Sequence, residues 1–160
     1  MKYTIEKMDN EFKIIPETST KYYISGWEAL NTPTEDRTTA DWHPYVYWLA
    51  TKKHKEIPLY QNTMLGDEGI EYRPIIWSGG KPVYIASFAR AIADILFTFP
   101  KDHPRVLELY GSRASLMTPE IEKKLFSYLL QLPDKEKALY FILHIIPTFY
   151  KEWKNVQIKH

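Results

Sequence analysis

Residues 82–99, with the sequence PVYIASFARAIADILFTF, are apolar almost throughout. Helical spacing places the large apolar residues on one broad face and leaves Ser87, Arg90 and Asp94 on a narrow polar stripe. This pattern predicts a mostly buried helix, which needs a folded domain around it. Arg90 and Asp94 lie four residues apart, so we expect an ion pair there rather than a substrate clamp. The two charges also exclude a membrane span.

The composition is that of one ordinary folded domain. The chain has 160 residues, with 21 Lys and Arg against 20 Asp and Glu, and no cysteine. At this length folding buries about 70% of the surface of the unfolded chain, so stability requires neither a disulfide nor a structural metal. The lack of cysteine excludes thiolate catalysis and favours a reducing cytoplasm as the compartment. The polar first ten residues predict no secretory or transit peptide.

Strand signals dominate the first half of the chain. Three short β-rich runs, the last of them around Tyr22, are separated by polar turn residues, and this spacing predicts a small antiparallel sheet. A further β-like run at residues 72–77 precedes Ser78-Gly79-Gly80-Lys81. Because Pro82 follows the lysine, this sequence does not match a phosphate-binding loop. We expect a turn there, between the strand and the long helix.

Helix-start signals fill the second half. Asp102-His103-Pro104 and Thr118-Pro119-Glu120 each place a capping residue before a proline, and Pro133-Asp134 begins one more helix. The sequence of this last helix is apolar on nearly all sides from residue 138 to 146, apart from His144. We therefore expect a central helix in which the histidine is a hydrogen-bonded core residue.

Together these patterns predict an α+β fold, in which a small N-terminal antiparallel sheet is followed by a bundle of three to four helices. We expect a single domain over residues 1–160. A sub-boundary near Pro82, between the strand-rich and helical halves, is the alternative.

The aromatic content, 15% of the chain, is the most unusual feature of the composition. Four aromatic residues crowd into residues 42–48, more than one face of a short element can bury, so we expect some to be exposed. Exposed Tyr and Trp side chains beside Asp and Thr are typical of interaction hot spots in protein contact sites. We therefore predict a non-catalytic cytoplasmic interaction domain, in the manner of an antitoxin, immunity protein or inhibitor, that binds a partner protein through an aromatic-acidic surface. The predicted contact residues are Trp27, Asp41, Trp42, His43, Tyr45, Tyr47 and Trp48. The sequence also leaves a homo-oligomer open.

A metal-assisted hydrolase or nuclease is the first alternative. Asp41 and His43 point to the same side of an extended segment, so they can share a metal ion or act as a base and its orienting partner. A carboxylate from Asp36 or Asp67 would complete the site. The commoner role of such an aspartate is a turn cap, and we predict no metal or other cofactor. The acidic residues 66–71 lack calcium-loop spacing and predict a solvated turn.

DNA binding by the helical half is the second alternative. It would use the basic residues around the two proline-capped helices, namely Arg105, Arg113, Lys123 and Lys124. The formal net charge is only +1, and the lysines are scattered rather than gathered into a basic stripe. Nucleic acid is therefore not the favoured partner, and no membrane association is expected.

Overall fold

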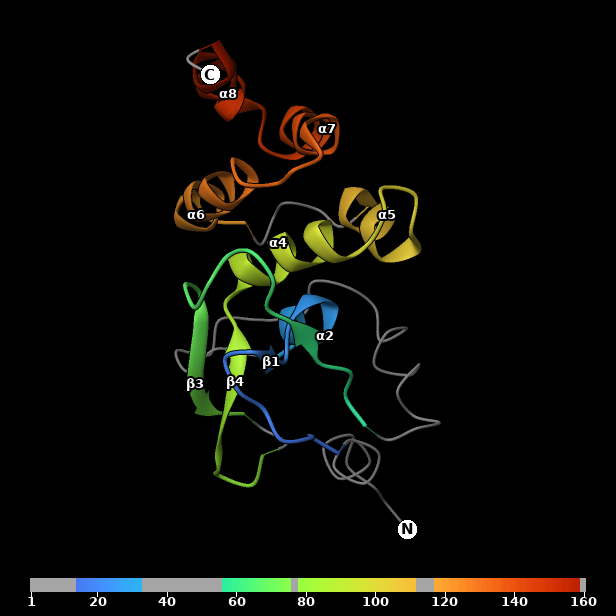
Figure 1. Ribbon diagram of the computed structural model, residues 1–160, viewed down its shortest axis with the longest axis vertical. Coiled ribbons are helices and arrows are strands. Elements are labelled where there is room, and N and C mark those ends of the chain that lie inside the picture. Colours follow the sequence, from blue (N-terminus) through green and yellow to red (C-terminus); the bar gives the residue numbers. More distant parts are fainter. Residues whose placement is uncertain (1–13, 33–55, 76–77, 112–116, 159–160) are drawn as a thin grey trace.

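Strands and helices are largely segregated along the chain and in space. The computed structural model describes residues 14–32, 56–75, 78–111 and 117–158. In Figure 1, β3, β4, β1 and α2 lie in the lower half, α5 to α8 lie in the upper half, and α4 runs between them. This arrangement confirms the predicted α+β class. The elements in chain order are β1 (Tyr22–Tyr23), α2 (Gly26–Leu30), β2 (Tyr60–Gln61), β3 (Ile70–Pro74), β4 (Pro82–Ala86), α4 (Phe88–Thr98), α5 (Pro104–Gly111), α6 (Pro119–Leu129), α7 (Lys135–Ile145), the 3-10 turn η2 (Pro147–Phe149) and α8 (Tyr150–Ile158).

The described residues form two antiparallel sheets of two strands each. β1 pairs with β2, with Tyr23 opposite Tyr60, and β3 pairs with β4 over its whole length. Ile24 extends the second sheet by a parallel bridge to Ile85 on β4. Among the described residues, β1 thus pairs with a strand much further along the chain, and not with another of the first β-rich runs. Short strands have little register preference of their own, so packing against distant segments decides their partners.

The apolar segment that begins at Pro82 is divided between a strand and a helix, whereas the sequence predicted one helix. Its first residues form β4, and Ser87 then caps α4 by accepting a hydrogen bond from the backbone N–H of Arg90 (3.3 Å). The Gly79-Gly80 turn consequently joins β3 to β4 rather than a strand to a helix. Every residue of α4 from Phe88 to Leu96 is buried, so α4 is the central helix.

The predicted starts of α5, α6 and α7 are confirmed. The side chain of Thr118 accepts a hydrogen bond from the backbone N–H of Ile121, and Asp134 does the same for Lys137. Before α5, the Nδ1 atom of His103 accepts from the backbone N–H of Arg105 (3.1 Å). Each cap satisfies an N–H that the first turn of a helix leaves unpaired.

The expectation that α7 is central is wrong. Only one of its faces is buried, through Lys137, Ala138, Phe141 and Ile142. His144 is exposed, and its Nδ1 atom lies 2.9 Å from the carbonyl oxygen of Tyr140 in its own helix. Because α4 fills the centre, α7 packs against the core from one side only. The chain then continues through η2 into α8, which returns Trp153 to the core.

One hydrophobic core includes residues from both sides of Pro82, from Tyr23 in β1 to Trp153 in α8. α2 and α6 both pack against α4. Among the described residues, no helix has the length and the apolar character needed to cross a membrane.

Candidate functional site

Two charged residues of the central helix form an ion pair inside the molecule. The Nε atom of Arg90 lies 3.0 Å from Oδ1 of Asp94, and the side chains are 1% and 7% exposed. The other carboxylate oxygen, Oδ2, accepts hydrogen bonds from the hydroxyls of Tyr23 (2.6 Å) and Ser25 (2.7 Å). The predicted ion pair is therefore confirmed, and both of its side chains are buried.

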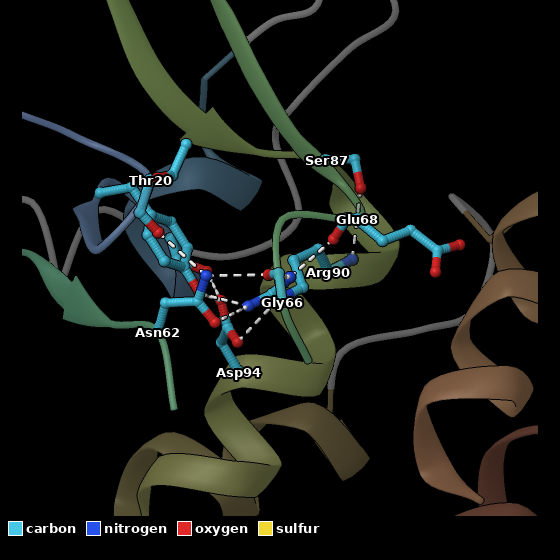
Figure 2. Close-up of polar contacts among 9 residues, drawn as sticks. Thr20, Asn62, Gly66, Glu68, Ser87, Arg90 and Asp94 are labelled. Carbon is cyan, nitrogen blue, oxygen red and sulfur yellow. Dashed lines mark hydrogen bonds and ion pairs between the residues drawn. The ribbon is translucent and has the colours of Figure 1, made fainter. Parts of the chain in front are cut away.

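The rest of the Arg90 guanidinium holds the loop that precedes β3. Nη1 donates to the carbonyl oxygens of Gly66 (2.8 Å) and Glu68 (2.6 Å), and Nη2 donates to the Tyr23 hydroxyl (2.9 Å) and to Oδ1 of Asn62 (3.0 Å). Figure 2 shows Asn62, Gly66 and Glu68 from the segment before β3, and Asp94 from α4, around Arg90. We call this group the Arg90 hub; its side chains are Tyr23, Ser25, Asn62, Arg90 and Asp94.

Arg90 has no N–H left for a substrate. A guanidinium carries five N–H donors, and five acceptors face them in the hub. Gly69 allows the loop to approach this closely, because its φ is +83° and an added Cβ would lie 2.6 Å from the Tyr128 hydroxyl. The hub is thus a closed structural network that fixes the loop to α4.

Burial sets the protonation behaviour of the hub. It raises the pKa of the Asp94 carboxyl, against the opposing effects of the Arg90 charge and of the Tyr23 and Ser25 hydroxyls. Burial, reinforced by the Asp94 charge, also raises the pKa of Tyr23 far above its usual value. Tyr23 therefore keeps its proton and stays a donor to the carboxylate.

A second buried ion pair joins α2 to α5. Both Nη atoms of Arg105 lie 3.1 Å from the oxygens of Glu28, whose side chain is 0% exposed. Burial raises the pKa of the Glu28 carboxyl, and Arg105 opposes this rise. The indole N–H of Trp27 donates to the carbonyl oxygen of Arg105 (2.9 Å). Trp27 is 0% exposed, so the residue expected at the partner surface is instead a core residue, because the whole of α2 is buried beneath α4 and α5.

Most of the residues predicted for the aromatic-acidic surface and the metal site lie outside the described residues. They are Asp36, Asp41, Trp42, His43, Tyr45, Tyr47 and Trp48, and they remain predictions. The described Asp67 lies in an exposed turn, as its sequence predicted. Within the described parts of the chain, no three His, Asp or Glu side chains come close enough together to hold a metal ion.

The basic residues named for DNA binding are not gathered on one surface by the described structure. Arg105 is paired with Glu28, and its side chain is only 16% exposed. Lys124 pairs with Glu68 at the surface (3.1 Å), while Lys123 is exposed on α6. Arg113 lies outside the described residues.

An open groove of about 840 Å³ lies between β3 and α6, beside the hub. Two of its hydroxyls, on Ser87 and Thr118, are occupied as helix caps. Burial raises the pKa of Tyr128, a third hydroxyl in the groove, to about 12. Three glutamates also line the groove, and two of them are paired, Glu68 with Lys124 and Glu71 with Arg73.

Exposed apolar side chains gather on the outer side of α5 and α7. The ring of Tyr140 stacks on His144, with centroids 4.0 Å apart, and meets Tyr110 of α5 edge-on at 5.1 Å. Tyr140 and Leu143 are 52% and 43% exposed, and Leu107, one turn before Tyr110, is 53% exposed. We call this surface the apolar patch; its members are Leu107, Tyr110, Tyr140, Leu143 and His144.

The sequence pattern did not indicate this patch, because it predicted that α7 would be buried on all sides. The sequence does contain one signal for the patch, because α7 carries more apolar residues than one contact face needs. Comparison with protein-family models, curated proteins and solved structures finds no match to this chain. The functional conclusion therefore depends on the geometry of the described residues.

Proposed function

We propose that this protein is a non-catalytic interaction domain that binds a partner protein through the apolar patch on α5 and α7. The observation that supports this proposal is the exposure of Leu107, Tyr140 and Leu143, each between 43% and 53%, together with the ring contacts that join Tyr110 of α5 to Tyr140 and His144 of α7. Contiguous apolar side chains at a surface, with tyrosine among them, are typical of protein contact sites.

The described polar groups favour binding over catalysis. Arg90 and Asp94 are fully occupied within the hub, and Glu28 and Arg105 neutralise each other. In the groove beside the hub, two hydroxyls are used as helix caps, and two of the glutamates are paired with Arg73 and Lys124. The buried ionisable side chains therefore stabilise the fold. The exposed side chains of the apolar patch contribute less to stability and remain available to a partner.

The aromatic-acidic residues 41–48 are a second proposed contact region for the same function. A cytoplasmic location and a role as an antitoxin, immunity protein or inhibitor are consistent with a cysteine-free domain of this size, and they are part of this proposal.

Affinity capture from native extract tests the patch directly. The double variant Tyr140→Ser/Leu143→Ser removes the two apolar side chains from α7, and Met64→Ser is the matched control, since Met64 is 53% exposed but lies in the loop before β3. We expect a stoichiometric partner to bind the wild type and the control and to be lost from the double variant, with all three folded by circular dichroism. Equal capture by all three would contradict the proposal.

A further inference from the structure

The charges of α7 are distributed unequally between its two sides. Lys137 points inward, where its Nζ atom donates to the carbonyl oxygens of Leu96 (2.5 Å) and Phe99 (2.6 Å) at the end of α4. Lys135 turns toward α8 and α6: its Nζ atom donates to the carbonyl of Leu130 (2.8 Å) and lies over the ring of Trp153. Neither lysine is directed toward the apolar patch.

Glu136 is the charged residue on the outer side of α7. It lies four positions before Tyr140 and seven before Leu143, so the three residues share one face of the helix, and all three are exposed. His144, at the edge of this face, already has its Nδ1 atom beside the Tyr140 carbonyl. Among the described residues of α7, the exposed face therefore carries apolar side chains and a carboxylate but no lysine or arginine.

The backbone of this surface constrains the shape of the partner. The N–H and C=O groups in the middle of α7 are paired within the helix, so the patch has no free sheet edge to offer an extended peptide. A partner that covers the patch must satisfy its own backbone, and a helix does so within a single segment. The exposed stripe from Glu136 to Leu143 spans two helical turns, about 12 Å along the axis, which fits one short helix packed alongside.

We infer that the patch binds an amphipathic helix of another protein, whose apolar stripe covers Tyr140 and Leu143 and whose flanking lysine or arginine pairs with Glu136. This inference rests on the proposed function and adds the chemistry of the partner. A second copy of the chain docked through the same face fits less well, because its own outer α7 face brings another carboxylate and no lysine or arginine to meet Glu136. A basic helix supplies the missing positive charge.

Synthetic peptides test separately the two parts of this inference, namely that the partner segment is helical and that it is positively charged. The probes are three labelled 18-residue peptides: one with a leucine stripe flanked by lysines, one with the same stripe flanked by glutamates, and a lysine peptide broken by a central proline. Fluorescence anisotropy measures their binding to the whole protein. We expect the lysine helix to bind about five-fold or more tightly than the glutamate helix, as one surface charge changes from attractive to repulsive, and the broken peptide to bind weakest.

Charge reversal in the protein gives the decisive comparison. Glu136→Lys should abolish or reverse the preference for the lysine helix. Glu17→Lys, the same charge change at an exposed residue in the strand half, should leave the preference intact. Tyr140→Ser should weaken both unbroken helices.

Other results would overturn different parts of the argument. Equal binding of lysine and glutamate helices, with loss in Tyr140→Ser, would contradict the inferred charge but keep the proposed function. Binding that Tyr140→Ser does not change would contradict the proposed function itself. A micromolar homodimer by light scattering that Tyr140→Ser makes monomeric would show that a second copy occupies the patch, and the inference would be wrong.

Discussion

Arg90 is charged and 1% exposed, whereas Tyr140 is aromatic and 52% exposed. Arg90 lies inside because the hub supplies an acceptor for each of its five N–H groups, which offsets the loss of water. Tyr140 lies outside because α7 turns its other face toward α4. The position of a side chain in this protein thus depends on what surrounds it in the fold more than on its polarity.

The comparison separates two uses of a side chain. In the Arg90 hub, each group depends on its partners, so the loss of one leaves the others buried without compensation. In the apolar patch, each side chain adds little to the fold and keeps exposed surface that a partner can cover. Substitutions in the hub should therefore change stability strongly, and substitutions in the patch should change binding alone.

The largest effect is expected for Asp94→Ala. It leaves the Arg90 guanidinium charged and buried, and removes the acceptor of the Tyr23 and Ser25 hydroxyls. The free energy of unfolding should fall by about 3–5 kcal/mol, the usual result of breaking a buried ion pair from one side. Urea denaturation measures it, and a loss below about 1 kcal/mol would mean that the hub is not a stabilising network.

A smaller loss is expected for Lys137→Met, on the inner side of the helix that carries the patch. The change keeps the apolar stem but leaves the buried carbonyls of Leu96 and Phe99 without their donor. We expect a loss of about 1–3 kcal/mol by the same denaturation. Lys135→Met, whose hydrogen bond is at the surface, is the matched control and should cost less than about 1 kcal/mol.

Alkaline pH should destabilise the protein through its buried tyrosines. Burial, with the nearby Glu68 charge, raises the pKa of Tyr128 to about 12, against about 10 in the unfolded chain. Because the folded-state pKa is raised, the contribution of Tyr128 to stability is present below pH 10 and is lost as the pH rises to about 12. The decline between pH 10 and 12 should be about 2 kcal/mol smaller in Tyr128→Phe than in the wild type. Parallel curves would rule out this role.

The smallest effect on stability is expected for Leu143→Ser, which should change the free energy of unfolding by less than about 0.5 kcal/mol while abolishing partner capture. The adjacent Ile142 is 0% exposed, so Ile142→Ser should cost several kcal/mol through lost burial and an unsatisfied hydroxyl. Thermal unfolding of the two variants compares neighbours on opposite faces of one helix. Similar losses in both would show that Leu143 belongs to the core.

Local signals predicted local structure correctly. Thr118 and Asp134 cap the helices that their sequences predicted, because a cap needs only a side chain and the next three residues. The boundary at Ser87 was accessible in principle, since a β-rich run followed by a serine can end a strand and begin a helix. Because the residues on both sides of Ser87 are apolar, the change from the strand period to the helix period is not visible in the hydropathy pattern.

The sequence pattern did not predict contacts between residues that are far apart in the chain. Asp94 meets Tyr23 across 71 positions, and no spacing rule connects residues so far apart. An all-apolar helix predicts burial, but it does not tell which of several helices takes the centre, so α4 and α7 were assigned the wrong relative positions. Trp27 was misplaced for a related reason: an indole next to polar residues has the same sequence context in a surface loop and in a buried helix.

The pairing of Glu28 with Arg105 also sets an order of events during synthesis. The two residues are 77 positions apart, so at about 5–20 residues per second the ribosome adds Arg105 roughly 4–15 s after Glu28. Until then, the Glu28 carboxylate has no counter-charge and resists desolvation. The Glu28 side chain therefore gains its ion-pair partner only after Arg105, the 105th of the 160 residues, has been added.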